Sequence, residues 1–121
     1  MIDHIGFEVT DLERSAGFYD AVFGALGGRR VHEGPHAIAY GTVGPQFWIV
    51  VRGRRPEPGY GHIALRARGR AAVNGAHRAA LAGGGRDDGA PGLRPQYGTL
   101  YYAAYVRDPD GLRVEFVSGS H

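Results

Sequence analysis

Apolar and polar residues alternate in two short segments of the chain that resemble each other. Residues 4–9 (HIGFEV) and residues 62–67 (HIALRA) each carry a histidine at the start and then an apolar residue at every second position. This period of two predicts a half-buried strand in each segment. Because the two histidines lie at matching places, we interpret the segments as copies within an internal repeat.

Helical spacing follows each of these predicted strands. Apolar residues recur at the helical period over residues 12–26, after Thr10 and Glu13, which have the spacing of a capping box, and Gly27-Gly28 ends the pattern. An alanine-rich stretch over residues 69–81 predicts the second helix, and three glycines follow it.

Short strand patterns separated by turn residues complete each half. They cover residues 29–33, 37–41 and 46–52 in the first half, and residues near 86–90, 100–106 and 112–118 in the second. A long loop is expected over residues 87–98, and residues 54–59 resemble a linker. We therefore predict one domain, residues 1–121, made of two βαβββ modules at residues 1–55 and 59–119.

Composition narrows the classes of function. The 121 residues include no cysteine, which excludes disulfides and thiolate ligands, and all 14 basic residues are arginine, which excludes a lysine Schiff base. A net charge of +2 is too small to favour nucleic acid, and no apolar run is long enough to span a membrane. We expect a soluble cytoplasmic protein that binds neither nucleic acid nor membrane.

Strand alternation brings three polar residues to one face. The apolar residues of the terminal strands are expected to pack on the helices, so His4, His62 and Glu115 fall on the opposite, helix-free face. Two imidazoles and one carboxylate suit a mononuclear divalent-metal site. A curved sheet would make this face a cup, with the ligands inside it.

Other residues are expected around that site. We place Phe47 and Ile49 on the same face as an apolar wall, with Trp48 under the helices, and Ile49 as the internal counterpart of Glu115. Tyr101 and Tyr105 share one face by parity and could contact a ligand.

Arg66 has two interpretations. It could form an ion pair with its repeat equivalent Glu8, or it could hold a substrate carboxylate.

The remaining histidines and the acidic turn have plainer interpretations. His32, His36 and His77 lack this geometry and are interpreted as surface or loop residues. Residues 108–111 (DPDG) have the composition of a turn.

Several motifs together resemble the vicinal oxygen chelate superfamily, which includes glyoxalase I, extradiol dioxygenases, fosfomycin-modifying enzymes and bleomycin-resistance proteins. The motifs are HIGF at residues 4–7, DLERS at residues 11–15 with Phe18-Tyr19, GHIAL at residues 61–65, and DPDG at residues 108–111 before VEF at residues 114–116. The resemblance implies an α+β fold in which two tandem βαβββ modules form a cupped, mostly antiparallel sheet with the helices on the outer face.

The resemblance also implies a function and a cofactor. The metal ligands of the family correspond to His4, His62 and Glu115, with Glu115 as the catalytic carboxylate and Fe, Mn, Ni or Zn as the metal. The implied activity is isomerase, lyase or dioxygenase chemistry on a small substrate that chelates the metal through vicinal oxygens. Ile49, where glyoxalase I has a further glutamate, argues against that enzyme. The alternative is a non-catalytic protein that binds a drug or natural product.

A homodimer is implied as well. In such dimers the modules can pair across chains, so His4 and His62 can come from different subunits.

Overall fold

Ten elements in the part of the chain that the structure describes form two copies of one βαβββ plan. The computed structural model describes residues 1–57 and 59–121. The first module contains β1 (Ile5–Val9), α1 (Leu12–Ala25), β2 (Arg29–Glu33), β3 (Ala37–Gly41) and β4 (Phe47–Val51). The second contains β5 (His62–Arg66), α2 (Arg70–Ala82), β6 (Arg86–Leu93), β7 (Tyr102–Arg107) and β8 (Arg113–Ser118).

The strands form two four-stranded sheets with the same order. The orders are β1-β4-β3-β2 and β5-β8-β7-β6, so the first strand of each module is an edge strand. The β1–β4 and β5–β8 pairs are parallel and the other pairs are antiparallel. The predicted α+β class with two βαβββ modules is confirmed, and each module builds its own sheet.

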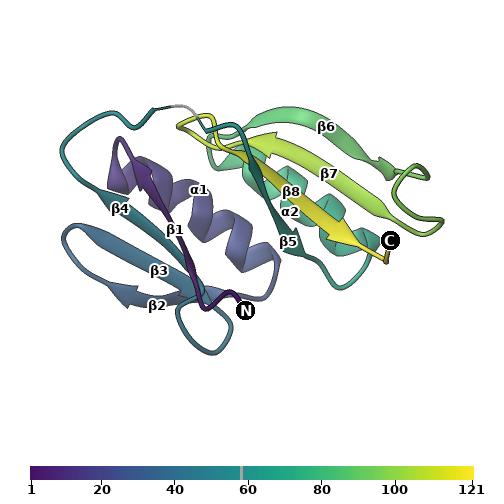
Figure 1. Ribbon diagram of the computed structural model, residues 1–121, viewed down its shortest axis with the longest axis horizontal. Helices are drawn as coiled ribbons and strands as arrows, with labels where there is room; N and C mark the ends of the chain where they lie inside the picture. The colour runs from purple at the N-terminus through teal and green to yellow at the C-terminus, as the bar shows by residue number, and fades with distance from the viewer. Residues whose placement is uncertain (58) are drawn as a thin grey trace.

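The two helices cover one face of each sheet and pack against each other. Figure 1 shows α1 and α2 behind the sheets, while β1 and β5 run in opposite directions on either side of the boundary between the modules. The core lies between helices and sheets, where aromatic rings from α1 pack on β3 and β4. Tyr19 and Phe23 lie 4.8 and 5.4 Å, ring centroid to centroid, from Phe47. One face of each sheet is left free of helices.

The predicted turn at residues 108–111 also joins the modules. Asp108, which is 3% exposed, accepts a hydrogen bond of 2.6 Å from the hydroxyl of Tyr19 in α1. Asp110 accepts hydrogen bonds from the backbone N–H and the hydroxyl of Thr10. Burial raises the pKa of the Asp108 carboxyl, and the Tyr19 hydrogen bond partly opposes this. These contacts tie the last turn of the chain to the start of α1.

This attachment explains one wrong detail of the sequence analysis. The N-cap of α1 is Asp11, whose carboxylate accepts from the backbone N–H of Arg14, and not Thr10. Thr10 is engaged by Asp110, 100 residues further along the chain. Local sequence contains no sign of that partner.

Two expectations for the second module were also wrong. The strand β6 extends to Leu93, through most of the expected loop, with register shifts near its glycines. His77 is buried, and its Nε2 atom lies 2.9 Å from Oδ1 of Asp87 on β6.

None of the helices in the described part of the chain has the length and apolar character needed to cross a membrane.

Candidate metal site

His62 and Glu115 meet on the helix-free face of the second sheet. His62 is the first residue of β5, and Glu115 on β8 is the register partner of Ala64. His62 and Ala64 are two residues apart on β5, so they share a face, and Glu115 shares that face because it is the ladder partner of Ala64. Nε2 of His62 lies 3.2 Å from Oε1 of Glu115. The sequence-based prediction that these two share a face agrees with this geometry.

Tyr101 holds the other oxygen of the same carboxylate. Its hydroxyl donates a hydrogen bond to Oε2 of Glu115, and both side chains are buried. Burial and this hydrogen bond raise the pKa of the Tyr101 hydroxyl above its usual value, so the group remains a donor. The carboxylate is therefore oriented, with Oε1 directed toward His62.

The donor set fits a divalent metal ion. Metal–nitrogen and metal–oxygen bonds are about 2.0–2.2 Å long, so two ligands at right angles on one ion lie about 3 Å apart. The observed 3.2 Å between Nε2 and Oε1 matches that separation. Moreover, a hydrogen-bonded carboxylate ligand is the usual arrangement in metal sites. His62 and Glu115 can hold an ion with Tyr101 as the outer partner.

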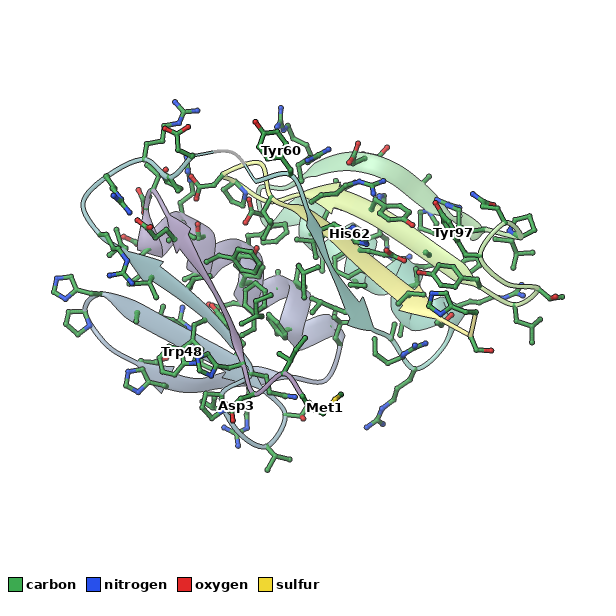
Figure 2. The ribbon with its side chains drawn as sticks, viewed as in Figure 1. Met1, Asp3, Trp48, Tyr60, His62 and Tyr97 are labelled. Atoms are coloured by element: carbon green, nitrogen blue, oxygen red, sulfur yellow. The ribbon has the colours of Figure 1, made fainter. Side chains whose placement is uncertain are left out.

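His4 lies elsewhere in the chain. It precedes β1, and its Nδ1 atom lies 2.7 Å from Oδ1 of Asp3, with both side chains exposed. In Figure 2, Asp3 lies at the lower end of β1, while His62 lies on the other sheet, toward the middle of the molecule. Among the described residues, no three histidine, aspartate or glutamate side chains gather closely enough to hold an ion.

The expected apolar wall is on the wrong face. Phe47 and Ile49 belong to the core, with 2% and 0% exposure, while Trp48 is partly exposed on the helix-free face. The register explains this, since Phe47 pairs with Ile5 and Trp48 with Gly6, and neighbours in a parallel ladder share a face. Phe47 also lines a groove of about 320 Å³ between the modules.

The same register corrects the internal alignment. Gly6 pairs with Trp48 in the first module, as Ala64 pairs with Glu115 in the second. The internal counterpart of Glu115 is therefore Trp48 and not Ile49. The first module still offers no carboxylate at this position, and an indole ring replaces it.

Arg66 and Glu8 do not pair with each other within the chain. Glu8 accepts two hydrogen bonds, of 2.9 and 2.8 Å, from Arg54, and this partner lowers the pKa of its carboxyl. The Nη1 atom of Arg66 donates to the carbonyl of Gly119 at 2.6 Å. The predicted ion pair is wrong because the linker supplies a nearer arginine.

Tyr105 lies beside the site on the same face. It is the register partner of Glu115 and packs with Tyr101, Ala103 and Val117, so the predicted shared face of the two tyrosines agrees with the structure. The guanidinium of Arg113 lies 4.0 Å from its ring centroid. Figure 2 shows a further tyrosine, Tyr97, over this end of the second sheet.

Comparison with known proteins decides the family. Residues 1–116 match the model of the Glyoxalase/Bleomycin resistance protein/Dioxygenase superfamily. The chain belongs to this superfamily.

Solved structures from the superfamily share the fold. A glyoxalase/bleomycin resistance protein from Albidiferax ferrireducens is 31% identical, with 94% of each chain covered and a TM-score of 0.82. A glyoxalase-related enzyme from Fulvimarina pelagi is 25% identical over 97% of this chain and 86% of its own, with a TM-score of 0.77. The fosfomycin resistance protein FosX from Mesorhizobium loti, 22% identical over 99% and 92% with a TM-score of 0.74, shares the fold. No curated protein matches the chain.

Two residues of this superfamily member were missed as site residues by sequence reasoning. Trp48 stands on the open face, and the ring of His32 lies 5.2 Å from the indole, centroid to centroid. A usable signal was present, since Gly6 and Ala39 are small residues on neighbouring strands and their register with Trp48 leaves room for a large ring. Reading that signal required the strand register.

Proposed function

We propose that this protein is a divalent-metal-dependent enzyme whose substrate chelates the metal through two neighbouring oxygens. The observation that carries the proposal is the pair of His62 and Glu115, whose donor atoms lie 3.2 Å apart with the carboxylate fixed by Tyr101. A buried carboxylate needs compensating charge. The Glu115 side chain is only 3% exposed, and a bound cation would supply that charge.

The third ligand in this proposal is His4 from a second copy of the chain. His4 and His62 occupy equivalent positions in the two sequence repeats. Within one chain, Asp3, which neighbours His4, lies at the lower end of β1 and away from His62 (Figure 2). A homodimer with a twofold axis can place the open face of the first sheet of one copy over the open face of the second sheet of the other. Each dimer would then contain two equal sites.

The residues have distinct roles in this arrangement. Glu115 and the two histidines hold the ion, and Tyr101 keeps the carboxylate oriented. Two histidines and one carboxylate leave coordination positions open for a substrate. When bound, the metal supplies Lewis-acid stabilisation of negative charge on the chelated oxygens. Fe would favour dioxygenase chemistry, whereas Mn, Ni or Zn would favour isomerase or lyase chemistry.

Metal binding by matched variants tests the proposal. The wild-type protein, Glu115→Gln and Glu8→Gln are loaded with Mn²⁺ or Zn²⁺, dialysed and analysed for metal content. Glu8 is a suitable control because it is a carboxylate on the open face of the other module, already paired with Arg54. We expect one ion per chain for the wild type and Glu8→Gln, and none for Glu115→Gln. Equal metal content in all three would contradict the proposal.

A second candidate is a non-catalytic protein that sequesters a drug or natural product. The aromatic residues on the open faces favour it, since Trp48, Tyr97 and Tyr101 are side chains suited to holding a flat ligand. Retention of full ligand affinity without metal and in Glu115→Gln would decide for this candidate.

A further inference from the structure

An indole ring stands where the second module has its carboxylate. The register partner of Gly6 is Trp48, and the register partner of Ala64 is Glu115. Each of these residues is thus a diagonal neighbour of a histidine, His4 in one module and His62 in the other. Since neighbours in a parallel ladder share a face, a long side chain at either position can reach toward the histidine of its module, as Glu115 reaches His62.

This equivalence relates the indole to His4, the ligand proposed for the site of a second copy. The side chains of His62 and Glu115 converge until their donor atoms are 3.2 Å apart. By the same alternation Trp48 lies on the helix-free face of the first sheet, the face on which His4 is expected one residue before β1. When His4 completes the site of a second copy, Trp48 borders that site from the same side.

The surroundings of the ring leave it available to a ligand. Its neighbours across the ladder are Gly6 and Ala39, which are too small to cover it. A methyl group built on Gly6 would lie 3.6 Å from the Cβ atom of Trp48, in ordinary contact. His32 packs against the indole at an interplanar angle of 45°, which supports it from the β2 side. Trp48 is therefore a platform that is held in place and partly exposed.

We propose that Trp48 selects substrates in which the chelating oxygens are attached to a flat aromatic or conjugated group. This inference rests on the proposed function, because it needs the shared metal site. An offset-stacked or edge-to-face contact with an indole favours a flat π-system over an aliphatic group. The absence of a carboxylate from this position also leaves that side of the site free for the ligand.

Two probes with the same chelating group test the inference. Acetohydroxamate and benzohydroxamate both bind metal ions through two neighbouring oxygens, and they differ only in a methyl or a phenyl substituent. Their dissociation constants are measured by calorimetry on the metal-loaded dimer. We expect benzohydroxamate to bind about tenfold more tightly to the wild type. Trp48 is the single tryptophan of the chain, so quenching of its fluorescence by benzohydroxamate provides an independent readout.

Variants at Trp48 separate this inference from the proposed function. In Trp48→Ala the preference for benzohydroxamate is expected to disappear, and in Trp48→Phe most of it is expected to remain. Metal content should stay unchanged in both, because Trp48 provides no ligand. Leu81→Ala, which truncates an exposed residue of α2, is the control and should retain the full preference.

Each outcome has a separate meaning. A tenfold preference that survives in both Trp48 variants, or no preference in the wild type, overturns the inference while the metal site stands. Absence of metal from the wild type after loading overturns the proposed function and the inference with it. If Trp48→Ala fails to fold, the comparison of Trp48→Phe with Trp48→Leu gives the same decision.

Discussion

The two modules repeat one strand plan, yet their open faces carry different chemistry. The second module presents His62, Glu115 and Tyr101, a set of donors joined by short contacts. In the first module the equivalent strands present His4, beside Asp3, and the indole of Trp48. The difference shows that strand register and helix packing are the same in both modules, while single positions on the open face carry different side chains.

The modules also differ in the contacts that their turns make with the other module. The second module sends its β7–β8 turn across to α1, where Asp108 and Asp110 bind Tyr19 and Thr10. The first module makes no equivalent contact to α2 among the described residues; its linker arginine instead binds Glu8 on its own sheet. Beside the packing of the two helices, the link through a turn is therefore one-sided.

The largest expected effect concerns the equivalence of the two histidines. His4→Ala should lower metal affinity by at least about 100-fold, as much as His62→Ala, because each removes one ligand from the same site. Calorimetric titration with Zn²⁺ measures both. His36→Ala, a loop histidine of the first module, is the control. An unchanged Zn²⁺ affinity in His4→Ala would mean that His4 is not a ligand and that the site lies in the second module alone.

A smaller loss is expected on removing the phenol that the first module lacks. Tyr101→Phe should reduce metal affinity by about tenfold, because Glu115 loses the donor that orients its second oxygen. Tyr105→Phe is the matched control: its ring packs beside Glu115, and no hydrogen bond of its hydroxyl is found among the described residues. Equal affinities in the two variants would mean that orientation of the carboxylate does not matter for binding.

The one-sided link gives a prediction about stability. Tyr19→Phe should lower the free energy of unfolding by about 1–2 kcal/mol, because the buried Asp108 loses a hydrogen bond. Urea unfolding measures the change. Tyr60→Phe, at a fully exposed position, should leave stability unaltered. If the two variants have the same free energy of unfolding within the error of the titration, the Tyr19–Asp108 hydrogen bond does not stabilise the protein.

The smallest expected effect is a pH dependence within the second module. The hydrogen bond with His77, and after it the N–H of Gly89, lower the pKa of Asp87 below its unfolded value. A carboxyl with a lowered folded pKa stabilises the protein above about pH 4, and this stabilisation is lost as the pH falls through the folded pKa. Asp87→Asn should therefore be less stable than wild type near neutral pH, with the gap closing below about pH 4. A difference in unfolding free energy between Asp87→Asn and the wild type that stays the same at every pH would contradict this prediction.

Much of the fold could be predicted because both copies of the repeat show clear local periodicity of apolar residues. Alternation at residues 4–9 and 62–67 and helical spacing after each segment gave both modules close to their observed bounds. The strand β6 was less clear, since its glycines and proline hide a strand whose pairing partner, β7, lies further along the chain. The contacts of Thr10 and His77 also depend on partners distant in sequence or across the core.

The candidate site could be predicted only where the alternation of apolar and polar residues along a strand is clear. His62 and Glu115 lie on strands whose alternating faces are clear, and they meet as expected. The face of Trp48 was predicted wrongly, because β4 (FWIVV) is apolar throughout and its parity cannot be read without the ladder to β1. Where both faces of a strand are apolar, register and not alternation decides which residue lines a site.

The proposed function requires each metal site to be shared between the second module of one copy and the first module of another. Mixed dimers of His4→Ala with His62→Ala test it directly, with differently tagged chains purified through both tags. We expect the mixed dimer to recover one ion for every two chains, since one of its two sites has His4, His62 and Glu115 intact, while each homodimer binds none. Absence of metal from the mixed dimer, with the wild-type dimer loaded, would contradict a shared site.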